Sequence, residues 1–344
     1  MSKVIAKLHR VPRTLNMLMN IEWGQFRTRG LAGYMQLRYK SLRSHVSDRY
    51  PQALQIEPYG GCNIRCSMCF QGKMRLPADK DLLDFDLYCR IIDEVSPYTP
   101  RLYLYWRGEP MLHPRLGDMI AHARKRGLYV FVSTNAVLLD EKRAQEFIDV
   151  GLDFLLVGFD GATKTSYEKM RRGAKFETIL ANIKNLISLK REQRSLLPHV
   201  SLQFIISAIN KGELQAFRNL AQDIGADSYI EKILDIYANF KNPKIDNSLQ
   251  ILYVDGEWSK YDGREDGLTP TGITKCDMAR RLVVRADGEL NLCCYDMQGQ
   301  YKIASACNNE IMPIWDSSAY VQLRNQGHKR FLELCQNCGV GLQR

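Results

Sequence analysis

Three cysteines stand within eight residues, in the segment Cys62-Asn63-Ile64-Arg65-Cys66-Ser67-Met68-Cys69. Thiolates bind soft metal ions and iron–sulfur clusters. A zinc site usually has four protein ligands arranged in pairs, and no fourth ligand lies near this segment in the sequence. Three thiolates on a 4Fe–4S cluster leave one iron without a protein ligand, so that iron is open to a cofactor. The spacing therefore favours a cofactor-binding iron–sulfur cluster over a zinc site.

The other cysteines also gather, because six of them lie in the last 69 residues: Cys276, Cys293, Cys294, Cys307, Cys335 and Cys338. The N-terminus Met1–Arg10 lacks the apolar core of a signal peptide. No apolar run approaches the ~18 residues that a membrane span needs. We therefore expect a cytoplasmic protein, in which disulfides are rare and grouped thiols indicate a metal site.

Short apolar runs rich in Ile, Val, Tyr and Phe alternate with stretches whose apolar residues recur every three or four positions. These patterns predict strands and helices. The predicted strands are Leu54–Pro58, Leu102–Trp106, Tyr129–Ser133, Phe154–Phe159, Val200–Ile206 and Ser228–Leu234, and the predicted helices are Asp86–Val95, Arg115–Arg126, Glu141–Val150, Phe176–Lys190 and Glu213–Ile224. Such alternation indicates an α/β fold, either an open parallel sheet or an incomplete (β/α) barrel, with its chemistry at the carboxyl ends of the strands.

After the sixth predicted strand the pattern changes. Residues 237–270 are polar and rich in Gly, Asn and Pro, which is typical of a loop-rich bridge. Residues 271–344 predict a second, smaller domain with a hairpin of Arg281–Ala286 and Glu289–Cys293, joined at Asp287-Gly288, and a helix over Ser317–Gln326. The predicted organisation is a leader over 1–50, a catalytic body over 51–236, the bridge and this domain.

The net charge of +10 is concentrated in the leader. Residues 1–50 carry ten Lys and Arg against Glu22 and Asp48, a net charge of +8, and the rest of the chain carries +2. The leader predicts either helices packed on the main domain with a solvated basic face, or a contact with an anionic membrane or a partner protein. Because the remaining chain is nearly neutral, we expect no nucleic-acid partner.

The first cysteine segment directly follows a predicted strand, and this arrangement resembles the radical S-adenosylmethionine (SAM) superfamily. The resemblance implies that Cys62, Cys66 and Cys69 hold a 4Fe–4S cluster whose open iron binds the amino and carboxyl groups of SAM. It also implies a partial (β/α)6 TIM-like barrel. After the second strand, Trp106-Arg107-Gly108-Glu109-Pro110 is similar to the GGEP-like motif of the family, in which the glutamate accepts a hydrogen bond from the SAM amino group.

Other strand ends match family segments that contact SAM. Ser133-Thr134-Asn135 ends the third strand, and Arg171 matches an arginine that pairs with the SAM carboxylate in relatives. Asp160 either lines the site or caps the next helix. The SAM-binding residues that the resemblance implies are Met68, Gly108, Glu109, Ser133, Asn135, Asp160 and Arg171.

The sequence departs from the family pattern at three positions. Met68 stands where many members have an aromatic residue, although a methionine also packs well against an adenine ring. Arg107 replaces the first glycine of the GGEP-like motif, and Gly158 stands where relatives often have a serine.

The second cysteine group resembles the SPASM and Twitch extensions of radical SAM enzymes, which begin with the spacing seen at Cys276, Gly288 and Cys293 and end with a cysteine pair. Because only six residues follow the last cysteine, the resemblance implies a small C-terminal α+β domain of the Twitch type with one auxiliary 4Fe–4S cluster. Its implied ligands are Cys276, Cys293, Cys335 and Cys338. Cys294 is an alternative ligand to Cys293, and a zinc site of four thiolates is the alternative metal centre.

The resemblance also implies the reaction type. One electron delivered to SAM yields a 5′-deoxyadenosyl radical, which abstracts hydrogen from a substrate carbon. We expect oxidation of a carbohydrate-like or other small polar substrate, with the auxiliary cluster as electron acceptor and a flavodoxin- or ferredoxin-like electron donor. Epimerisation with Cys294 or Cys307 as hydrogen donor, peptide modification and a lipid-linked substrate stay open. The non-enzymatic alternative is a zinc-dependent nucleic-acid-binding protein.

Overall fold

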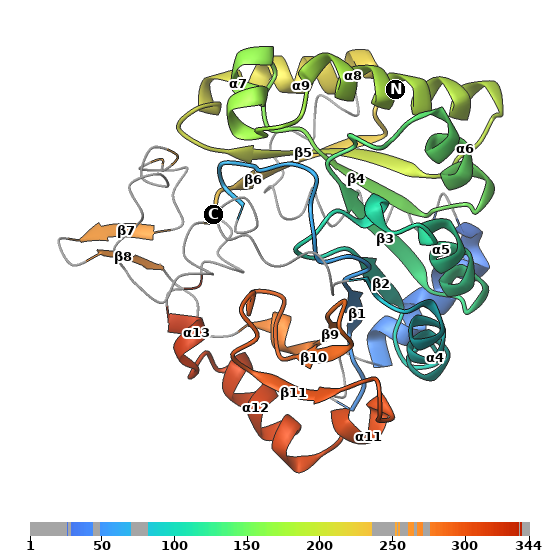
Figure 1. The fold of residues 1–344 in the computed structure, drawn as a ribbon, viewed down its shortest axis with the longest axis vertical. Coiled ribbons are helices and arrows are strands. Elements are labelled where there is room, and N and C mark those ends of the chain that lie inside the picture. Colours follow the sequence, from blue (N-terminus) through green and yellow to red (C-terminus); the bar gives the residue numbers. More distant parts are fainter. Residues whose placement is uncertain are drawn as a thin grey trace.

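The computed structural model describes residues 26, 29–43, 49–69, 82–235, 252, 254, 261–264, 267–270, 276–336 and 338. Six parallel strands lie side by side in the order of the chain (Figure 1). They are β1 (Ala53–Ile56), β2 (Arg101–Leu104), β3 (Tyr129–Thr134), β4 (Phe154–Gly158), β5 (His199–Ile206) and β6 (Ser228–Ile233). The predicted alternation is confirmed, and these strands form the parallel sheet of a partial barrel.

Every crossover between these strands contains a helix. The helices are α4 (Phe85–Val95), η2 (Pro110–Leu112), α5 (Leu116–Lys125), α6 (Glu141–Asp149), α7 (Lys164–Met170), α8 (Phe176–Glu192), η3 (Lys211–Glu213) and α9 (Leu214–Ile224). Asp84, Asp140 and Thr163 begin α4, α6 and α7, each accepting a hydrogen bond from the N–H three residues later. The sequence pattern missed α7, because this helix is only seven residues long and offers little periodicity.

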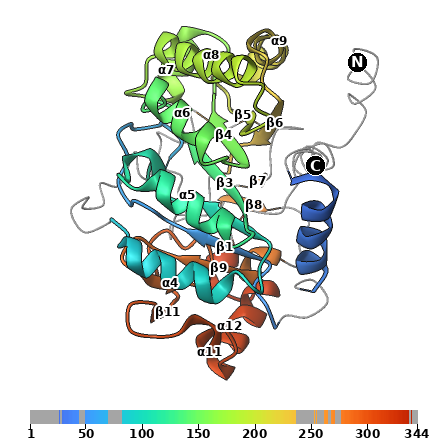
Figure 2. The same ribbon diagram turned by 90° about the vertical axis from the view of Figure 1, so that its right-hand side faces the viewer.

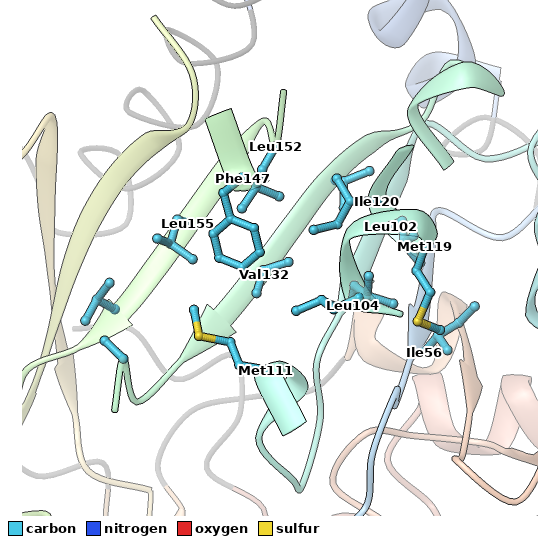
Figure 3. Packing of buried hydrophobic residues seen from close by; sticks show 14 of the residues in the cluster. Ile56, Leu102, Leu104, Met111, Met119, Ile120, Val132, Phe147, Leu152 and Leu155 are labelled. Carbon is cyan, nitrogen blue, oxygen red and sulfur yellow. The ribbon is translucent and has the colours of Figure 1, made fainter. Parts of the chain in front are cut away.

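The main core lies between the strands and the helices that cover one face of the sheet (Figure 3). Labelled side chains there are Ile56, Leu102, Leu104, Met111, Met119, Ile120, Val132, Phe147, Leu152 and Leu155, each at most 2% exposed. Full burial of one such side chain contributes about 1.5–3 kcal/mol. This packing holds the carboxyl ends of β1 to β4 in place, and the loops that follow these strands build the site.

The chain from residue 276 onward extends the same sheet. β9 (Arg281–Val284) pairs parallel to β1, β10 (Glu289–Asn291) pairs antiparallel to β9, and β11 (Lys302–Ser305) completes nine strands. Gly288 turns the predicted hairpin at φ +81°, where a side chain would be strained. The other elements are η5 (Asp277–Arg280), α11 (Ile311–Trp315), α12 (Ser318–His328) and α13 (Glu333–Gln336). The end of β9 therefore lies beside the end of β1.

The predicted bridge and leader are described only in part. In the bridge, β7 (Tyr261–Arg264) and β8 (Gly267–Pro270) form an antiparallel pair. In the leader, residues 29–43 form a helix on the face of the sheet opposite α4 and α5 (Figure 2), and Arg29 pairs there with Asp153 at 2.6 Å. Residues 1–25 and most of 236–260 lie outside the described residues. No helix in the described ranges is long and apolar enough to span a bilayer.

Candidate active site

A cavity of about 400 Å³ opens at the carboxyl ends of the parallel strands. Side chains from six strand ends and from the C-terminal unit meet there. Its wall contains most residues predicted for the first cluster and for SAM, namely Cys62, Cys66, Met68, Cys69, Gly108, Glu109, Ser133, Asn135 and Arg171. Residues without a predicted role also line it, including Tyr105, Arg107, Gln203, Lys232, Asp235 and Tyr295. The topology thus brings the predicted site residues together.

The first cysteine loop follows β1 and is fixed at its middle by the end of α7. The backbone N–H of Arg65 donates to the carbonyl of Arg172 at 2.8 Å, and the N–H of Ser67 donates to the carbonyl of Met170 at 2.8 Å. The loop therefore spans the mouth of the barrel from β1 to the segment after β4. Its position depends on both sides of the barrel.

The three thiols of this loop differ in exposure: Cys62 is exposed, Cys69 is half-buried and Cys66 is buried. Although Cys62 as a whole residue is exposed, desolvation of its thiol raises the pKa to about 11, and burial raises the pKa of Cys66 to about 12. Without metal these two thiols keep their protons at neutral pH, and metal binding releases the protons of thiol ligands. Three sulfur donors beside a cavity suit a 4Fe–4S cluster with one open iron.

Glu109 is the buried acid of the cavity wall, with 3% exposure. Its Oε1 accepts hydrogen bonds from Thr134 Oγ1 at 2.8 Å and from the Met111 N–H at 3.1 Å, and its Oε2 accepts one from the Asn135 N–H at 2.8 Å. Burial raises the pKa of this carboxyl, and the hydrogen bonds oppose the rise. A carboxylate oxygen accepts two hydrogen bonds, so Oε2 is suited to one more donor such as an ammonium group.

Arg171 lines the cavity from the end of α7 and is held there by Asp160. Its Nη2 and Nε lie 2.7 and 2.8 Å from Asp160 Oδ2, and Asp160 Oδ1 accepts a hydrogen bond from the Ile205 N–H at 2.7 Å. Neither interpretation of Asp160 matches this arrangement. Its buried carboxylate is not in the described cavity wall, and Thr163 caps α7. Asp160 positions Arg171, because a buried carboxylate needs a fixed counter-ion.

Two glycines make room for these groups. At Gly108 a Cβ would lie 1.9 Å from the Tyr59 carbonyl oxygen. Only glycine therefore allows the segment after β2 to approach the backbone that precedes the cysteine loop so closely. At Gly158 a Cβ would lie 1.8 Å from Arg171 Nη2. The Arg171 guanidinium therefore lies directly against the backbone at Gly158, and a larger residue there would require this flexible side chain to shift.

Glu57 and Arg107 form a buried ion pair that joins the barrel to the C-terminal unit. Arg107 Nε and Nη2 donate to Glu57 Oε1 and Oε2 at 2.9 and 2.6 Å, a bidentate geometry. Glu57 Oε2 also accepts from the Ala286 N–H at 3.3 Å, and Arg107 Nη1 donates to the Met297 carbonyl at 3.4 Å. Arg107 stood out in the sequence only as a departure from the family motif. An acid directly after a buried strand, as Glu57 is, signals such a partner.

The second group of cysteines lines a small cavity of about 20 Å³, whose sulfur donors are Cys276, Cys293, Cys335 and Cys338. Burial raises the pKa of the Cys276 and Cys335 thiols. In the described part of the chain, no three Cys, His, Asp or Glu side chains are grouped closely enough to hold a single metal ion. Four thiols that converge from three segments suit a fully ligated 4Fe–4S cluster.

Cys294 and Cys307, the predicted hydrogen donors, lie outside the described wall of the active-site cavity. Cys294 is buried, and its carbonyl accepts a hydrogen bond from Trp106 Nε1. Cys307 is exposed, with its thiol 3.7 Å from the Asp287 carbonyl at the β9–β10 turn. The arrangement does not support either thiol as a donor to substrate. It favours Cys293 over Cys294 as a ligand, since Cys293 alone of the two lines the cysteine cavity.

Two family models match this chain. The model of the radical SAM superfamily matches residues 56–205, and the model of the SPASM iron–sulfur cluster-binding domain matches residues 276–339. Together the matches cover more than half of the chain. The first runs from the last residue of β1 through β2, β3 and β4 into β5, and the second contains all four cysteines of the small cavity.

Curated relatives align with part or most of this chain. The tungsten-containing aldehyde ferredoxin oxidoreductase cofactor-modifying protein of Pyrococcus furiosus is 23% identical over 314 residues, which are 83% of this chain and 87% of its own. The Fe-coproporphyrin III synthase of Methanosarcina barkeri is 26% identical over 47% of this chain and 39% of its own length. The PqqA peptide cyclase of Gluconobacter oxydans is 24% identical over 51% of this chain and 47% of its own. The chain thus spans most of the first relative and less than half of the other two.

Solved structures share the fold. BtrN in complex with AdoMet and 2-DOIA has a TM-score of 0.55 and 17% identity over 87% of this chain and 97% of its own. SuiB of Streptococcus suis, bound to the precursor peptide SuiA, has a TM-score of 0.61 and 11% identity over 85% of this chain and 71% of its own. These structures share the fold, and the two family matches identify the chain as a radical SAM enzyme with a C-terminal SPASM domain, whose cofactors are SAM and 4Fe–4S clusters.

Proposed function

We propose that this enzyme dehydrogenates a carbohydrate-like or other small polar substrate and that an auxiliary 4Fe–4S cluster accepts an electron. When bound, SAM and its cluster supply the radical that takes hydrogen from carbon, and the auxiliary cluster supplies a one-electron acceptor. The proposed ligands of the first cluster are Cys62, Cys66 and Cys69. Those of the auxiliary cluster are Cys276, Cys293, Cys335 and Cys338.

One observation carries the proposal: the loop that holds Cys293 also lines the active-site cavity. Tyr295 and Met297, two and four residues after this cysteine, belong to the cavity wall with Glu109 and Arg171. An electron acceptor so close to the substrate space suits a reaction that removes an electron from the substrate. An epimerase needs a hydrogen donor there instead, and neither predicted cysteine donor is in the described wall.

The cavity wall supports a small polar substrate. Away from the cysteine loop it contains Gln203, Lys232 and Asp235 together with the aromatic residues Tyr105 and Tyr295. A cation, an anion and an amide in one wall provide donors and acceptors for hydroxyl or amino groups. The volume of about 400 Å³ lies within the ~300–1,000 Å³ range of ligand sites.

The proposed roles toward SAM combine the family resemblance with this geometry. Glu109 accepts a hydrogen bond from the ammonium group, and Arg171, held by Asp160, pairs with the carboxylate. Met68 packs against the adenine ring. Gly108 allows the loop that bears Glu109 to lie close to the cysteine loop. Ser133 and Asn135 contact the ribose and the carboxylate of SAM. In each case the protein residue binds and orients the cofactor, which supplies the radical chemistry.

The experiment is a turnover assay of the anaerobically reconstituted protein with SAM, a reductant and a panel of amino sugars and polyols. We expect 5′-deoxyadenosine in equal amount to a product that is lighter by two hydrogen atoms. A product of unchanged mass with solvent deuterium on carbon would contradict dehydrogenation and indicate epimerisation. Zinc in place of iron after reconstitution would support the nucleic-acid-binding alternative, against which the family membership argues.

A second candidate comes from the relative that aligns over most of both chains. The Pyrococcus furiosus protein is a cofactor-modifying protein of a tungsten-containing aldehyde ferredoxin oxidoreductase. The substrate of this chain would then be a cofactor, or part of one, that serves another enzyme. An organic cofactor with hydroxyl and amino groups meets the same polar wall of Lys232 and Asp235. Incubation with cofactor extracts and mass spectrometry would separate this candidate from free sugars.

The partner proposals are an external electron donor and a surface contact of the leader. A flavodoxin- or ferredoxin-like protein delivers the electron that SAM cleavage requires. On the helix over residues 29–43, Leu31, Met35 and Tyr39 are 66%, 59% and 62% exposed. These apolar side chains support the prediction that the leader contacts a membrane or a partner protein. Vesicle flotation of the full chain tests the membrane contact.

A further inference from the structure

Tyr295 belongs to the walls of two cavities. It lines the active-site cavity, and it also lines the small cavity among the cysteines of the second group. No other residue that the structure describes is shared by these two walls. Tyr295 is half-buried, and its side chain packs against Cys338. The two spaces therefore meet at this side chain.

The backbone around Tyr295 is fixed on both sides. Its N–H donates to Cys293 Sγ at 3.4 Å, and the carboxylate of the next residue, Asp296, accepts hydrogen bonds from the N–H groups of Gln300 and Tyr301, both at 2.8 Å. Asp296 is 1% exposed, so these bonds are shielded from water. These bonds hold the backbone from which the aromatic side chain projects in a defined turn.

Asp235 and Lys232 belong to the active-site wall together with Tyr295. Cys293 and Cys338 belong to the wall of the cysteine cavity, which also contains Tyr295. The aromatic ring therefore lies between the space for the substrate and the cysteines of the second group.

We propose that Tyr295 is a positioning residue that separates the substrate from the auxiliary cluster, shields that cluster from water and sets how closely the substrate approaches it. The inference rests on the proposed function, because it requires a cluster on the second cysteine group. Met297 provides the matched comparison, since it lies on the same loop and lines the active-site cavity but not the described wall of the cysteine cavity.

The first test measures shielding without any substrate. In a full-length background with Cys62, Cys66 and Cys69 changed to Ala, iron binds only at the second group, and its loss to a ferrous chelator is followed by visible absorbance. Tyr295→Ala is expected to speed this loss about tenfold, as expected when the shell around a metal site is opened. Tyr295→Phe and Met297→Ala are expected to stay near the rate of the background protein. Equal rates in Tyr295→Ala and Met297→Ala would overturn the proposal.

The second test uses the enzyme with both cysteine groups intact. Tyr295→Ala is expected to form 5′-deoxyadenosine at a normal rate with less product per molecule formed, and Tyr295→Phe is expected to restore the ratio. An unchanged ratio in Tyr295→Ala would contradict the role in substrate approach. If the triple-cysteine background binds no iron, the auxiliary cluster itself is refuted, and this outcome is distinct from a cluster that Tyr295 does not shield.

Discussion

The two cysteine groups of this chain are built in opposite ways. Cys62, Cys66 and Cys69 come from one loop, include an exposed thiol and border a cavity of about 400 Å³. The second group comes from three segments and encloses about 20 Å³. An open group leaves a position for a ligand that reacts, whereas a closed group satisfies its metal fully, as in catalytic and structural zinc sites. The difference supports the proposal that the first group holds the cluster that binds SAM and that the second group holds the auxiliary cluster.

The segment Trp106-Arg107 ties the two groups together. It directly precedes Gly108 and Glu109 of the SAM motif, and it bonds to the loop that follows Cys293. Because both contacts end on backbone carbonyls, they depend on the position of that loop rather than on its side chains. Substitutions can therefore be directed at the open group, at the closed group or at the link between them.

The largest effect is expected from removing one ligand of each group. Cys62→Ala is expected to abolish SAM cleavage, because the cluster that binds SAM loses a ligand. Cys276→Ala is expected to keep 5′-deoxyadenosine formation and to lose the oxidised product, because only the closed group is damaged. Chromatography of 5′-deoxyadenosine and product measures both.

Cys89→Ala is the control for a cysteine outside both groups, on α4, and should leave both quantities unchanged. Cleavage of SAM at the wild-type rate by Cys62→Ala would refute the assignment of the open group. Loss of SAM cleavage in Cys276→Ala would show that SAM cleavage also requires the closed group, and would contradict the different roles proposed for the two groups.

The next effect concerns the buried pair that joins the two units. Glu57→Gln removes the charge that Arg107 needs, and breaking one partner of a buried pair costs about 3–5 kcal/mol. The free energy of unfolding of the metal-free protein in urea is expected to fall by that amount. Asp118→Asn breaks the exposed Arg115–Asp118 pair, whose side chains are 49% and 59% exposed, and should change it by less than about 0.5 kcal/mol. Equal effects of the two variants would show that the Glu57 pair is not a structural link.

A smaller effect is expected at the SAM end of the open group. In Gly158→Ala the new Cβ would meet Arg171 Nη2 at 1.8 Å, so the guanidinium must shift from its present position, and we expect its geometry toward SAM to be disturbed. The Kd for SAM is expected to rise about tenfold, or 1.4 kcal/mol. Equilibrium dialysis measures it, with Gly212→Ala as the control because no atom lies within 4 Å of a Cβ there. Unchanged SAM affinity in Gly158→Ala would argue against a role for Arg171 in SAM binding.

The contrast between the groups also explains how far the sequence predicts this structure. The open group lies on one loop, so its spacing after a strand could be recognised directly. The six strands were predictable because buried parallel strands form continuous apolar runs. The closed group needs Cys276 and Cys338 to meet across 62 positions, and its spacing was recognisable only through the resemblance to a family.

Other features depend on contacts that no local pattern contains. The sequence around Asp160 looks the same whether this residue lines a site, caps a helix or pairs with an arginine. Its partner, Arg171, lies eleven residues away. Tyr295 looks like an ordinary aromatic residue until the fold sets it between two cavities. A side chain whose role is to separate two spaces has no sequence signature, because both spaces are made by other segments.

The smallest effect isolates the link at Trp106. Trp106→Phe removes the indole N–H that donates to the Cys294 carbonyl, and one such bond contributes about 1 kcal/mol. Hydrogen exchange at the amides of Tyr295 and Met297 is expected to rise about fivefold, the factor that 1 kcal/mol corresponds to. Amides of β4 and β5 serve as the internal control, since they lie in the barrel away from this loop. A rise confined to the loop means that Trp106, which lies beside the SAM motif, stabilises the loop after Cys293. Equal exchange in both places would mean that the second group holds its loop alone, and the two groups would then be independent in structure as well as in construction.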